Sequence, residues 1–461
     1  MATVPEANET IAAIATAPGA GGIGIVRLSG PQSARILHSL FRPKRSEFTS
    51  HQLYYGTIAG ADGQILDEVL AVLMQAPRSY TREDVVEIHC HGSALVLHKV
   101  LHEVLLQGAR VAEPGEFTKR AFLAGRIDLT RAEAVIDLVQ ARTDAGAAMA
   151  LSQMQGVLSQ EIEAVHQALI DCLALLEVAI DFPDEDMELL DTVSLVQQLE
   201  KMVEVPLQEL IGRSVQGKIL REGIKVVLAG RPNVGKSSLL NRLLQEERAL
   251  VNEQPGTTRD TLEEWVDVRG IPVQLVDTAG IRDHADPVEG LGIERARQKV
   301  ATADLVLFMV DGDSGCQQED LDLYASLADR PHLVVINKVD IAEPTEVRAL
   351  QERFTDGICL SARRGDGLDL LFTAVEKNVL GAKEGACRER PACAPSLRHR
   401  TALEKTLEAV QRTMTALHRG EPADLLAVEV QSALDHLGDI VGLTTPEDVL
   451  DTIFTRFCLG K

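Results

Sequence analysis

The sequence is short of basic residues, of long apolar runs and of paired cysteines. It has 46 Lys and Arg against 69 Asp and Glu, a formal net charge of −23. A protein that coats nucleic acid non-specifically needs clustered cations, so this balance argues against that class, although it leaves room for a local site for a particular RNA. No apolar run approaches the length of a membrane span, so none is predicted. The seven cysteines are scattered without a Cys-x-x-Cys pair, which indicates neither a zinc site nor a disulfide framework.

Targeting signals are also missing from the start of the sequence. Residues 1–10 contain neither the basic nor the apolar segment of a secretory signal peptide. Together with the scattered thiols, this predicts a cytoplasmic protein with reduced cysteines. The chain has 461 residues, 45% apolar and 25% charged, which is typical of globular proteins. That length accommodates two to four domains, each with its own core.

The first part of the chain alternates short strand-like runs with helical patterns. Strands are predicted at residues 23–28, 70–74 and 85–90, and a helix at 94–106. This alternation predicts an α+β domain over residues 1–125.

Helical patterning begins near Leu129. Apolar residues from Leu151 to Ile180 keep three- and four-residue spacing, which predicts one continuous helix face that ends at Pro183. A second helical stretch is predicted over residues 194–221.

Helices are predicted again after a linker over residues 381–395. The last of them has Thr445 as its N-cap and Pro446 in its first turn. Because helical segments flank an α/β section, we expect one helical domain, residues 126–222 and 381–461, with residues 223–380 inserted into it. Two separate helical domains are the alternative.

The strongest chemical signal is the run Gly-Arg-Pro-Asn-Val-Gly-Lys-Ser at residues 230–237. It lies between a predicted strand and a predicted helix, the context that the pattern G-x-x-x-x-G-K-[ST] requires. Gly230 and Gly235 let the backbone wrap a phosphate, with amides pointing at the anion. Lys236, which we count as catalytic, meets the terminal phosphates, and the Ser237 hydroxyl is placed to bind Mg²⁺. A nucleoside triphosphate site is therefore predicted at Asn233, Val234, Gly235, Lys236, Ser237 and Ser238.

Three further motifs follow predicted strands in the same section. Asp277-Thr-Ala-Gly280 supplies a carboxylate that can hold Mg²⁺ through water and a glycine amide for the γ-phosphate. Asn337-Lys-Val-Asp340 supplies a carboxylate that can accept two N–H bonds from a guanine edge, the role we assign to Asp340. Ser361-Ala-Arg363 completes the base pocket. The four motifs in this order favour GTP over ATP, and the added contacts are Asp277, Thr278, Ala279, Gly280, Asn337, Lys338, Asp340, Ser361, Ala362 and Arg363.

The segment between the first two motifs contains Thr257 and Thr258 after a Pro-Gly pair. One threonine hydroxyl there can complete the Mg²⁺ shell while the γ-phosphate is present, so the loop is predicted to be a switch, with Thr258 as the Mg²⁺ ligand. A solvated turn is the alternative. Ile281 stands where small switch GTPases place a water-orienting glutamine. A substitute is therefore expected among the acidic residues of the loop 282–289.

Taken with the flanks, these residues resemble the bacterial and organellar MnmE (TrmE) family of tRNA-modification GTPases. The resemblance covers nearly the whole chain, and a generic GTPase would match only one of its specific segments. Those segments are residues 22–30, 113–123, 181–184, 230–238 and the run Phe457-Cys-Leu-Gly-Lys461.

The resemblance implies a fold of three parts: an N-terminal α+β domain that dimerises and binds folate, a helical domain, and an inserted Ras-like G domain. It implies that GTP hydrolysis accompanies the addition of a carboxymethylaminomethyl or aminomethyl group at C5 of a wobble uridine in tRNA. The one-carbon unit would come from 5-formyltetrahydrofolate or 5,10-methylenetetrahydrofolate. The expected assembly is a homodimer, in a heterotetramer with an FAD-dependent protein of the MnmG (GidA) type.

The resemblance also explains the missing glutamine. In this family the G domains pair around a K⁺ ion, which offsets charge developing during phosphoryl transfer. It implies K⁺ ligands at Asn233, Asn252, Gln254 and Thr257, and a catalytic Glu289 that orients the attacking water through a second water. Without the resemblance, Glu289 would be read as a surface acid.

Folate-binding positions implied by the resemblance are Arg27, Glu87, Arg126 and Lys461. A pterin needs a carboxylate that accepts paired ring N–H bonds, which suits Glu87, and a carboxylated tail suits Arg27 or Arg126. Cys458, expected near the end of an amphipathic helix, is either a small apolar packing residue or, as the family implies, a catalytic residue near the folate. We expect His89, Cys90 and His91 to be structural, because strand alternation separates the thiol from the two imidazoles.

Two other functions compete with this one. A ribosome-assembly switch GTPase would carry a basic RNA-binding appendage, which the acidic balance and Cys458 argue against. A folate enzyme with a regulatory G domain would differ mainly in whether tRNA is obligatory.

Overall fold

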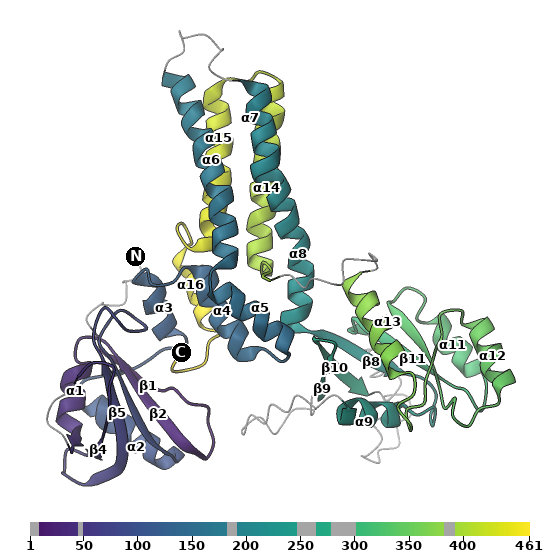
Figure 1. Ribbon diagram of the computed structural model, residues 1–461, viewed down its shortest axis with the longest axis horizontal. Coiled ribbons are helices and arrows are strands. Elements are labelled where there is room, and N and C mark those ends of the chain that lie inside the picture. Colours follow the sequence, from purple (N-terminus) through teal and green to yellow (C-terminus); the bar gives the residue numbers. More distant parts are fainter. Residues whose placement is uncertain (1–8, 45–48, 182–190, 247–263, 278–300, 382–391) are drawn as a thin grey trace.

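The computed structural model describes residues 9–44, 49–181, 191–246, 264–277, 301–381 and 392–461 of the chain. Figure 1 shows an elongated helical bundle with a sheet-containing unit at each side of its base. The N-terminal residues form one unit, and the elements from β8 to α13, which follow α8 (Val205–Glu222), form the other. Within these ranges, none of the helices combines the length and the apolarity needed to cross a membrane.

The N-terminal unit is a seven-stranded sheet in the order β3-β4-β5-β6-β2-β1-β7. Its buried side chains, such as Val26, Leu28 and Ile88, alternate with polar ones along β2 and β6, as a sheet with one covered face requires. The elements are β1 (Ile11–Ile14), β2 (Gly21–Ser29), α1 (Ser33–Leu40), β3 (Phe41–Pro43), β4 (Leu53–Ala59), β5 (Ile65–Met74), β6 (Val85–Gly92), α2 (Ala94–Leu106), β7 (Arg110–Val111) and α3 (Glu116–Leu123).

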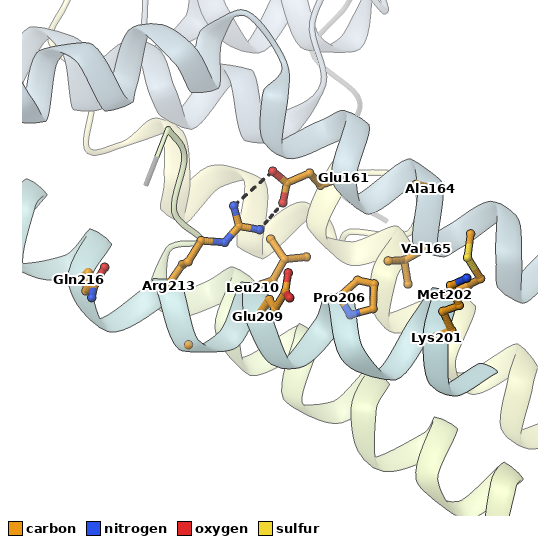
Figure 2. Close-up of a pocket in the computed structure, with 11 residues that line it drawn as sticks. Glu161, Ala164, Val165, Lys201, Met202, Pro206, Glu209, Leu210, Arg213 and Gln216 are labelled. Carbon is orange, nitrogen blue, oxygen red and sulfur yellow. Dashed lines mark hydrogen bonds and ion pairs between the residues drawn. The ribbon is translucent and has the colours of Figure 1, made fainter. Parts of the chain in front are cut away.

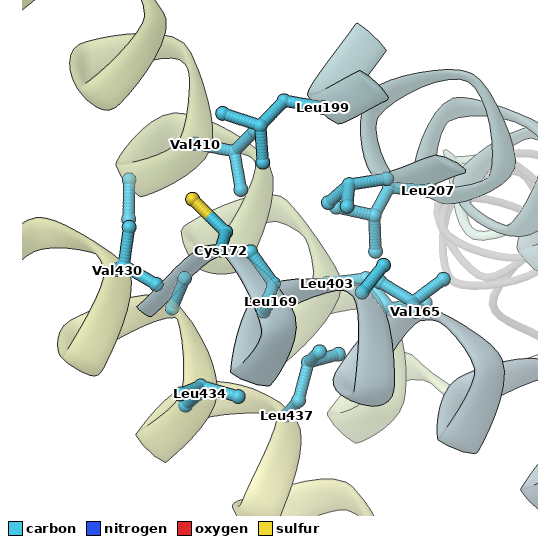
Figure 3. Close-up of a cluster of buried hydrophobic side chains, with 14 of the residues drawn as sticks. Val165, Leu169, Cys172, Leu199, Leu207, Leu403, Val410, Val430, Leu434 and Leu437 are labelled. Atoms are coloured by element: carbon cyan, nitrogen blue, oxygen red, sulfur yellow. The ribbon is translucent and has the colours of Figure 1, made fainter. Parts of the chain in front are cut away.

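The helical bundle is built from two distant stretches of the chain that share one core (Figure 3). Leu169 and Cys172 of α6 pack there with Val410 of α14 and Val430 and Leu437 of α15. The sheet unit between the two stretches is therefore an insertion, which confirms the predicted fold class; the exact domain boundaries stay a prediction. The helices are α4 (Leu129–Gln140), α5 (Asp144–Met154), α6 (Val157–Asp181), α7 (Thr192–Leu199), the π-helix η2 (Glu200–Glu204), α8, α14 (Leu397–His418), α15 (Ala423–Val441) and α16 (Glu447–Phe454).

Two details of the predicted helices are wrong. The continuous face from Leu151 to Ile180 is broken between α5 and α6, because Gly156 has a left-handed backbone with φ of 91°. Thr445 is not the N-cap of α16, which is Pro446. The Thr445 hydroxyl instead donates to the carbonyl of Asp439 at 2.9 Å, so it fastens the preceding turn to α15.

A groove of about 710 Å³ runs between α6 and the η2–α8 segment, and the ion pair of Glu161 with Arg213 crosses it (Figure 2). Pro206, two residues after the end of the π-helix, lines this groove. Proline has no amide hydrogen, so it leaves an α-helical carbonyl without its donor and favours such an irregular turn. None of the residues predicted to bind a ligand lines the groove.

The inserted unit has a six-stranded sheet in the order β13-β12-β11-β8-β10-β9, parallel except for the pair β9–β10. The central strand β11 is buried along its whole length, as expected where helices cover both faces. The carboxyl ends of β8, β10, β11 and β12 meet at one edge, where parallel sheets place their ligands. The elements are β8 (Ile224–Ala229), α9 (Lys236–Glu246), β9 (Glu264–Val268), β10 (Ile271–Asp277), β11 (Leu305–Asp311), α11 (Gln318–Ala325), β12 (His332–Asn337), α12 (Pro344–Arg353), β13 (Ile358–Cys359) and α13 (Leu368–Leu380).

Candidate functional site

The loop between β8 and α9 has a backbone that demands glycine at two positions. Gly230 and Gly235 have φ values of 151° and 99°, in the region that other residues avoid. A Cβ atom would lie 2.5 Å from the carbonyl oxygen of Met309 at Gly230, and 2.2 Å from the Asn337 side-chain nitrogen at Gly235. Asn233 is also left-handed, with φ of 65°, a conformation that asparagine tolerates. These positions wrap the loop tightly before the first turn of α9.

Lys236 lies inside this loop. The residue is only 8% exposed, and its Nζ donates to the carbonyls of Gly230 and Arg231, both at 2.8 Å. Two backbone carbonyls of the loop thus hold the ammonium near the start of α9. Backbone amides at the start of α9 complete a concave anion site. The geometry fits the triphosphate of a nucleotide.

Asn337 joins two of the predicted motifs. Its amide nitrogen donates to the Val234 carbonyl at 2.8 Å, and its side-chain oxygen accepts from the Ala362 amide at 3.0 Å. The side chain is buried, and both of its polar ends are in use. Asn337 therefore fixes the phosphate loop relative to the segment Ser361–Arg363.

The carboxylate of Asp340 lies beside that segment. Its side chain is 8% exposed, and the Arg364 guanidinium lies 3.9 Å away. Arg364 belongs to a turn that the Ser361 hydroxyl fastens by accepting from the Arg364 amide at 3.1 Å. Lys338, left-handed with φ of 66°, pairs with Asp311 at 2.7 Å. Burial alone would raise the pKa of Asp311, but the Lys338 ammonium and a backbone amide hold it below the ordinary value.

Several predicted residues cannot be located. Asp277 ends β10, and its side chain is not among those described. The predicted switch, the acidic loop with Ile281, and the residues after Asp277 lie outside the described residues, namely Asn252, Gln254, Thr257, Thr258, Thr278, Ala279, Gly280 and Glu289.

One contact of the phosphate loop was not predicted from the sequence. The Nε of Arg231 donates to Asp320 at 2.7 Å, and this carboxylate is fully buried at the start of α11. Asp320 also accepts from the amide of Gln317, so it caps the helix and anchors the loop at once. No local pattern links two residues 89 positions apart.

A second polar site lies on the N-terminal sheet. Arg27 of β2 and Glu87 of β6 are register partners, and the Arg27 Nε donates to the Glu87 carboxylate at 2.9 Å. A terminal guanidinium nitrogen of Arg27 also donates to the carbonyl of Gly460 at 3.1 Å. The other oxygen of Glu87 lies 3.2 Å from the Nε2 of His89. The structure thus brings two predicted folate residues into contact with the end of the described chain.

Gly460 can approach the sheet because it lacks a side chain. Its φ is 87°, and a Cβ atom would lie 2.6 Å from the Ile14 carbonyl oxygen. Lys461 follows it, with its amide donating to the Cys458 carbonyl at 3.3 Å. The turn Cys458–Lys461 therefore lies against the open end of β1.

Arg126 is linked to the same region through Tyr80, whose phenol lies in the field of both Arg126 and Arg27. Its guanidinium donates to the Tyr80 carbonyl at 2.9 Å and lies 4.9 Å from the centre of the Tyr80 ring. Arg27 lies 5.8 Å from the ring centre of Phe117. Burial raises the pKa of Tyr80, so this phenol stays neutral. The two aromatic rings were not predicted as site residues.

The placement of Cys458 corrects one expectation. The residue lies beyond the end of α16 at Phe454, not within an amphipathic helix, and it is exposed. Because Cys458 is exposed, it is not an apolar packing residue. The run His89-Cys90-His91 behaves as expected: Cys90 is buried, and His91 pairs with Asp67 at 2.7 Å. No cluster of three metal-ligating side chains occurs within the ranges that the structure describes.

The inserted sheet and its wrapped loop define a P-loop nucleotide-binding domain of the GTPase class. Comparison with known families is specific. The family described as "GTP-binding protein TrmE N-terminus" matches residues 10–126, and "MnmE helical domain" matches residues 129–458. A protein named tRNA modification GTPase MnmE from Desulfotalea psychrophila is 52% identical over 462 residues, covering 98% of each chain. A protein of the same name from Syntrophotalea carbinolica is 47% identical, over 98% of this chain and 99% of the relative's length.

The chain therefore belongs to the MnmE family of tRNA modification GTPases, as its motifs predicted. The family membership makes it an enzyme that hydrolyses GTP.

Proposed function

We propose that this GTPase is the GTP-hydrolysing subunit of an enzyme that modifies C5 of the wobble uridine in tRNA. The product would carry a carboxymethylaminomethyl or aminomethyl group, built with a one-carbon unit from a tetrahydrofolate. The observation that carries this proposal is the presence, in a member of this family, of two separate polar sites: the phosphate loop and the Arg27–Glu87–Gly460 cluster. A protein that only switches between nucleotide states needs the first of these sites but not the second.

At the nucleotide site, the proposed guanine partner is Asp340, with Asn337, Lys338 and the segment Ser361–Arg363 shaping the base pocket. Ser237 and Thr258 would hold Mg²⁺, a hard cation that prefers oxygen ligands. We propose that Asn233 contributes to K⁺ binding together with Asn252, Gln254 and Thr257. Glu289 would orient the attacking water, since Ile281 cannot.

At the second site, we propose a folate. Glu87 would accept from the pterin ring N–H groups, for which it would exchange its present partners Arg27 and His89. The guanidinium of Arg27, once released, or that of Arg126, would hold the carboxylates of the folate tail. Tyr80 offers aromatic surface near Arg126, while Phe117 is buried beneath Arg27 and supports it from the core. The bound folate would supply the one-carbon unit.

Cys458 is proposed to act in the same reaction. It is exposed, and the turn that carries it is tied to Arg27 through Gly460. Lys461 extends the turn and would add a cation for the folate. The partners we propose are a second copy of this chain, an FAD-dependent protein of the MnmG type and tRNA, all in the cytoplasm.

The test of the potassium site compares GTPase rates in KCl and NaCl at equal ionic strength. We expect faster hydrolysis in KCl, and we expect Asn233→Ser to remove the difference, because the serine hydroxyl is too short to reach the position of the asparagine amide oxygen. Equal rates of the unchanged protein in both salts would refute the potassium mechanism.

The test of the tRNA role uses Cys458→Ser. We expect GTP hydrolysis to continue while wobble-uridine modification in cells is lost, as measured by mass spectrometry of tRNA nucleosides. Cys316→Ser, which changes a half-buried thiol in the inserted unit, is the matched control and should keep both activities. Unchanged modification in the Cys458 variant would remove this residue from the site.

A further inference from the structure

Beside the junction of α8 with the inserted sheet, the inserted GTPase unit touches the helical unit at a corner. This corner is the turn between α4 and α5, and it meets the hairpin β9–β10. The guanidinium of Arg142 lies 3.6 Å from the centre of the Trp265 ring. The Thr143 hydroxyl donates to the Gly270 carbonyl at 3.0 Å. Each contact joins a residue before the insertion to a residue within it.

Thr143 is tightly held in this position. It is 5% exposed, and its hydroxyl also accepts from the amide of Gly146 at 3.1 Å as the N-cap of α5. The hydroxyl proton is thus directed at Gly270, and a shift of the hairpin would break one of the two bonds. A contact of this kind has two distinct states, made or broken.

Trp265 also packs against the point where the chain enters the inserted unit. Gly223 joins α8 to β8 with φ of 76°, and a Cβ atom there would lie 2.3 Å from the Pro272 oxygen and 2.8 Å from the Trp265 ring. The returning segment is fixed as well. Arg221 donates to the carbonyls of Ala394 and Pro395 at 2.7 and 2.9 Å.

The other end of the same hairpin leads to the predicted nucleotide contacts. Strand β9 begins six residues after Thr258 and ends two residues before Gly270, and β10 runs from Ile271 to Asp277. Seven residues of strand span roughly 23 Å. Because β10 pairs with the central strand β8 from Val273 to Asp277, it transmits displacement along its length without bending easily. The hairpin therefore connects the predicted γ-phosphate contacts to the corner at Arg142.

We propose that Arg142 and Thr143 are positioning residues for GTP hydrolysis, and that their contact with the β9–β10 hairpin responds to the bound nucleotide. The inference rests on the nucleotide site proposed above. Arg142 and Thr143 hold the hairpin in the register that suits one nucleotide state, and the other state strains or breaks the contact. This coupling is reciprocal. If exchanging GDP for GTP changes the equilibrium between the made and the broken contact by some factor, then breaking the contact changes the ratio of the GTP and GDP affinities by the same factor.

Helix α4, which precedes the corner, connects this contact to the Arg27–Glu87–Gly460 cluster of the second site. Helix α4 ends two residues before Arg142, and its first turn packs through Leu129 on Phe454 of α16. Helix α16 is followed by the turn that carries Cys458 and Gly460. A change in the orientation of α4 therefore reaches the residues that contact Arg27.

Trp265 is the only tryptophan in the chain, so its fluorescence reports on this contact directly. The experiment records emission of the full-length protein with GDP and with a non-hydrolysable GTP analogue, while calorimetry measures the affinity for each. We expect different emission in the two states. We expect Arg142→Ala to abolish the difference and to change the ratio of the two affinities by about fivefold, a typical allosteric coupling.

Conservative variants separate positioning from folding. Arg142→Lys keeps a cation over the ring, and Thr143→Ser keeps the hydroxyl; both should retain most of the emission change and of the affinity ratio. Arg348→Ala, an exposed arginine on α12, is the matched control and should behave like the unchanged protein. Far-UV circular dichroism confirms that each variant is folded.

Identical Trp265 emission in the two nucleotide states, with both nucleotides bound, would overturn the proposal, as would an unchanged affinity ratio in Arg142→Ala. Either result leaves GTP binding and hydrolysis intact. Failure of the proposed nucleotide site is a different outcome, because calorimetry would then show no binding of GTP to the unchanged protein.

Discussion

Asp137 carries a partly buried carboxylate that weakens the native protein at neutral pH. It lies on α4, and its nearest cation is Arg221, with 4.0 Å between the guanidinium and the carboxylate. One turn earlier, Glu133 already occupies Arg398 at 2.9 Å and His399 at 2.6 Å. Burial raises the pKa of Asp137 to about 6, because the attraction of Arg221 does not compensate and the Glu133 charge opposes ionisation.

The raised pKa makes stability depend on pH in a defined direction. Well below pH 4 the carboxyl is protonated in both the native and the unfolded chain. Between the ordinary value of 3.8 and about 6, the native chain keeps a proton that the unfolded chain releases, so the native state becomes progressively less favoured as pH rises. About two pKa units correspond to about 3 kcal/mol. The side chain is 24% exposed, so solvent screens part of this cost. We expect removal of the charge to raise the free energy of unfolding by about 1–3 kcal/mol.

The perturbation is Asp137→Asn, which keeps the shape and removes the charge. We expect the free energy of unfolding of the helical bundle to rise by that amount at pH 8, with the gain shrinking toward zero near pH 4. Urea titrations followed by circular dichroism at several pH values measure it. Asp171→Asn, an exposed acid on α6, is the control and should change stability little at any pH. If Asp137→Asn destabilised the bundle at pH 8, burial would not be the dominant effect on this carboxyl.

Three further predictions concern the two sites. Lys236→Ala should weaken GTP binding by about 10- to 100-fold, the effect of losing charge-assisted bonds of about 1.5–3 kcal/mol, in a fluorescent-nucleotide titration; unchanged affinity would show that Lys236 does not reach the phosphates. Asp340→Asn should weaken binding of GTP at least 100-fold while leaving ATP binding as weak as before, because a guanine N–H then faces an amide donor; equal affinities for GTP in both proteins would exclude Asp340 from the base pocket. Gly460→Ala should displace the turn from β1 and weaken binding of a tetrahydrofolate by about tenfold in calorimetry without changing GTP hydrolysis; unaltered folate binding would separate the turn from the second site.

Local patterns predicted those parts of the molecule where one stretch of chain decides the structure. Helix α2 has the predicted bounds, and the phosphate loop lies between a strand and a helix as its spacing required. The continuous helix through residue 156 was wrong because apolar spacing cannot show that a single glycine adopts a left-handed backbone. The N-cap of α16 was wrong because the Thr445 hydroxyl finds a tertiary acceptor on α15.

The second site was harder to predict from the residues themselves. Arg27 and Glu87 read as ordinary charges on two strands, and only the resemblance to the family singled them out. Pairing in register places them together, and the Gly460 carbonyl reaches Arg27 from 433 residues away. Tyr80, in a loop, and Phe117, on α3, were missed because no sequence spacing relates either ring to its arginine partner.

The contact between Arg27 and Gly460 also sets an order of events during synthesis. Ribosomes add about 5–20 residues per second, so the 433 residues between these partners take roughly 20–90 seconds to make. Throughout that interval the N-terminal sheet can fold with Arg27 and Glu87 in place but without the turn that closes against β1. The second site is therefore completed last, and a nascent chain that stops between α13 and Cys458 has a GTPase unit but an incomplete second site.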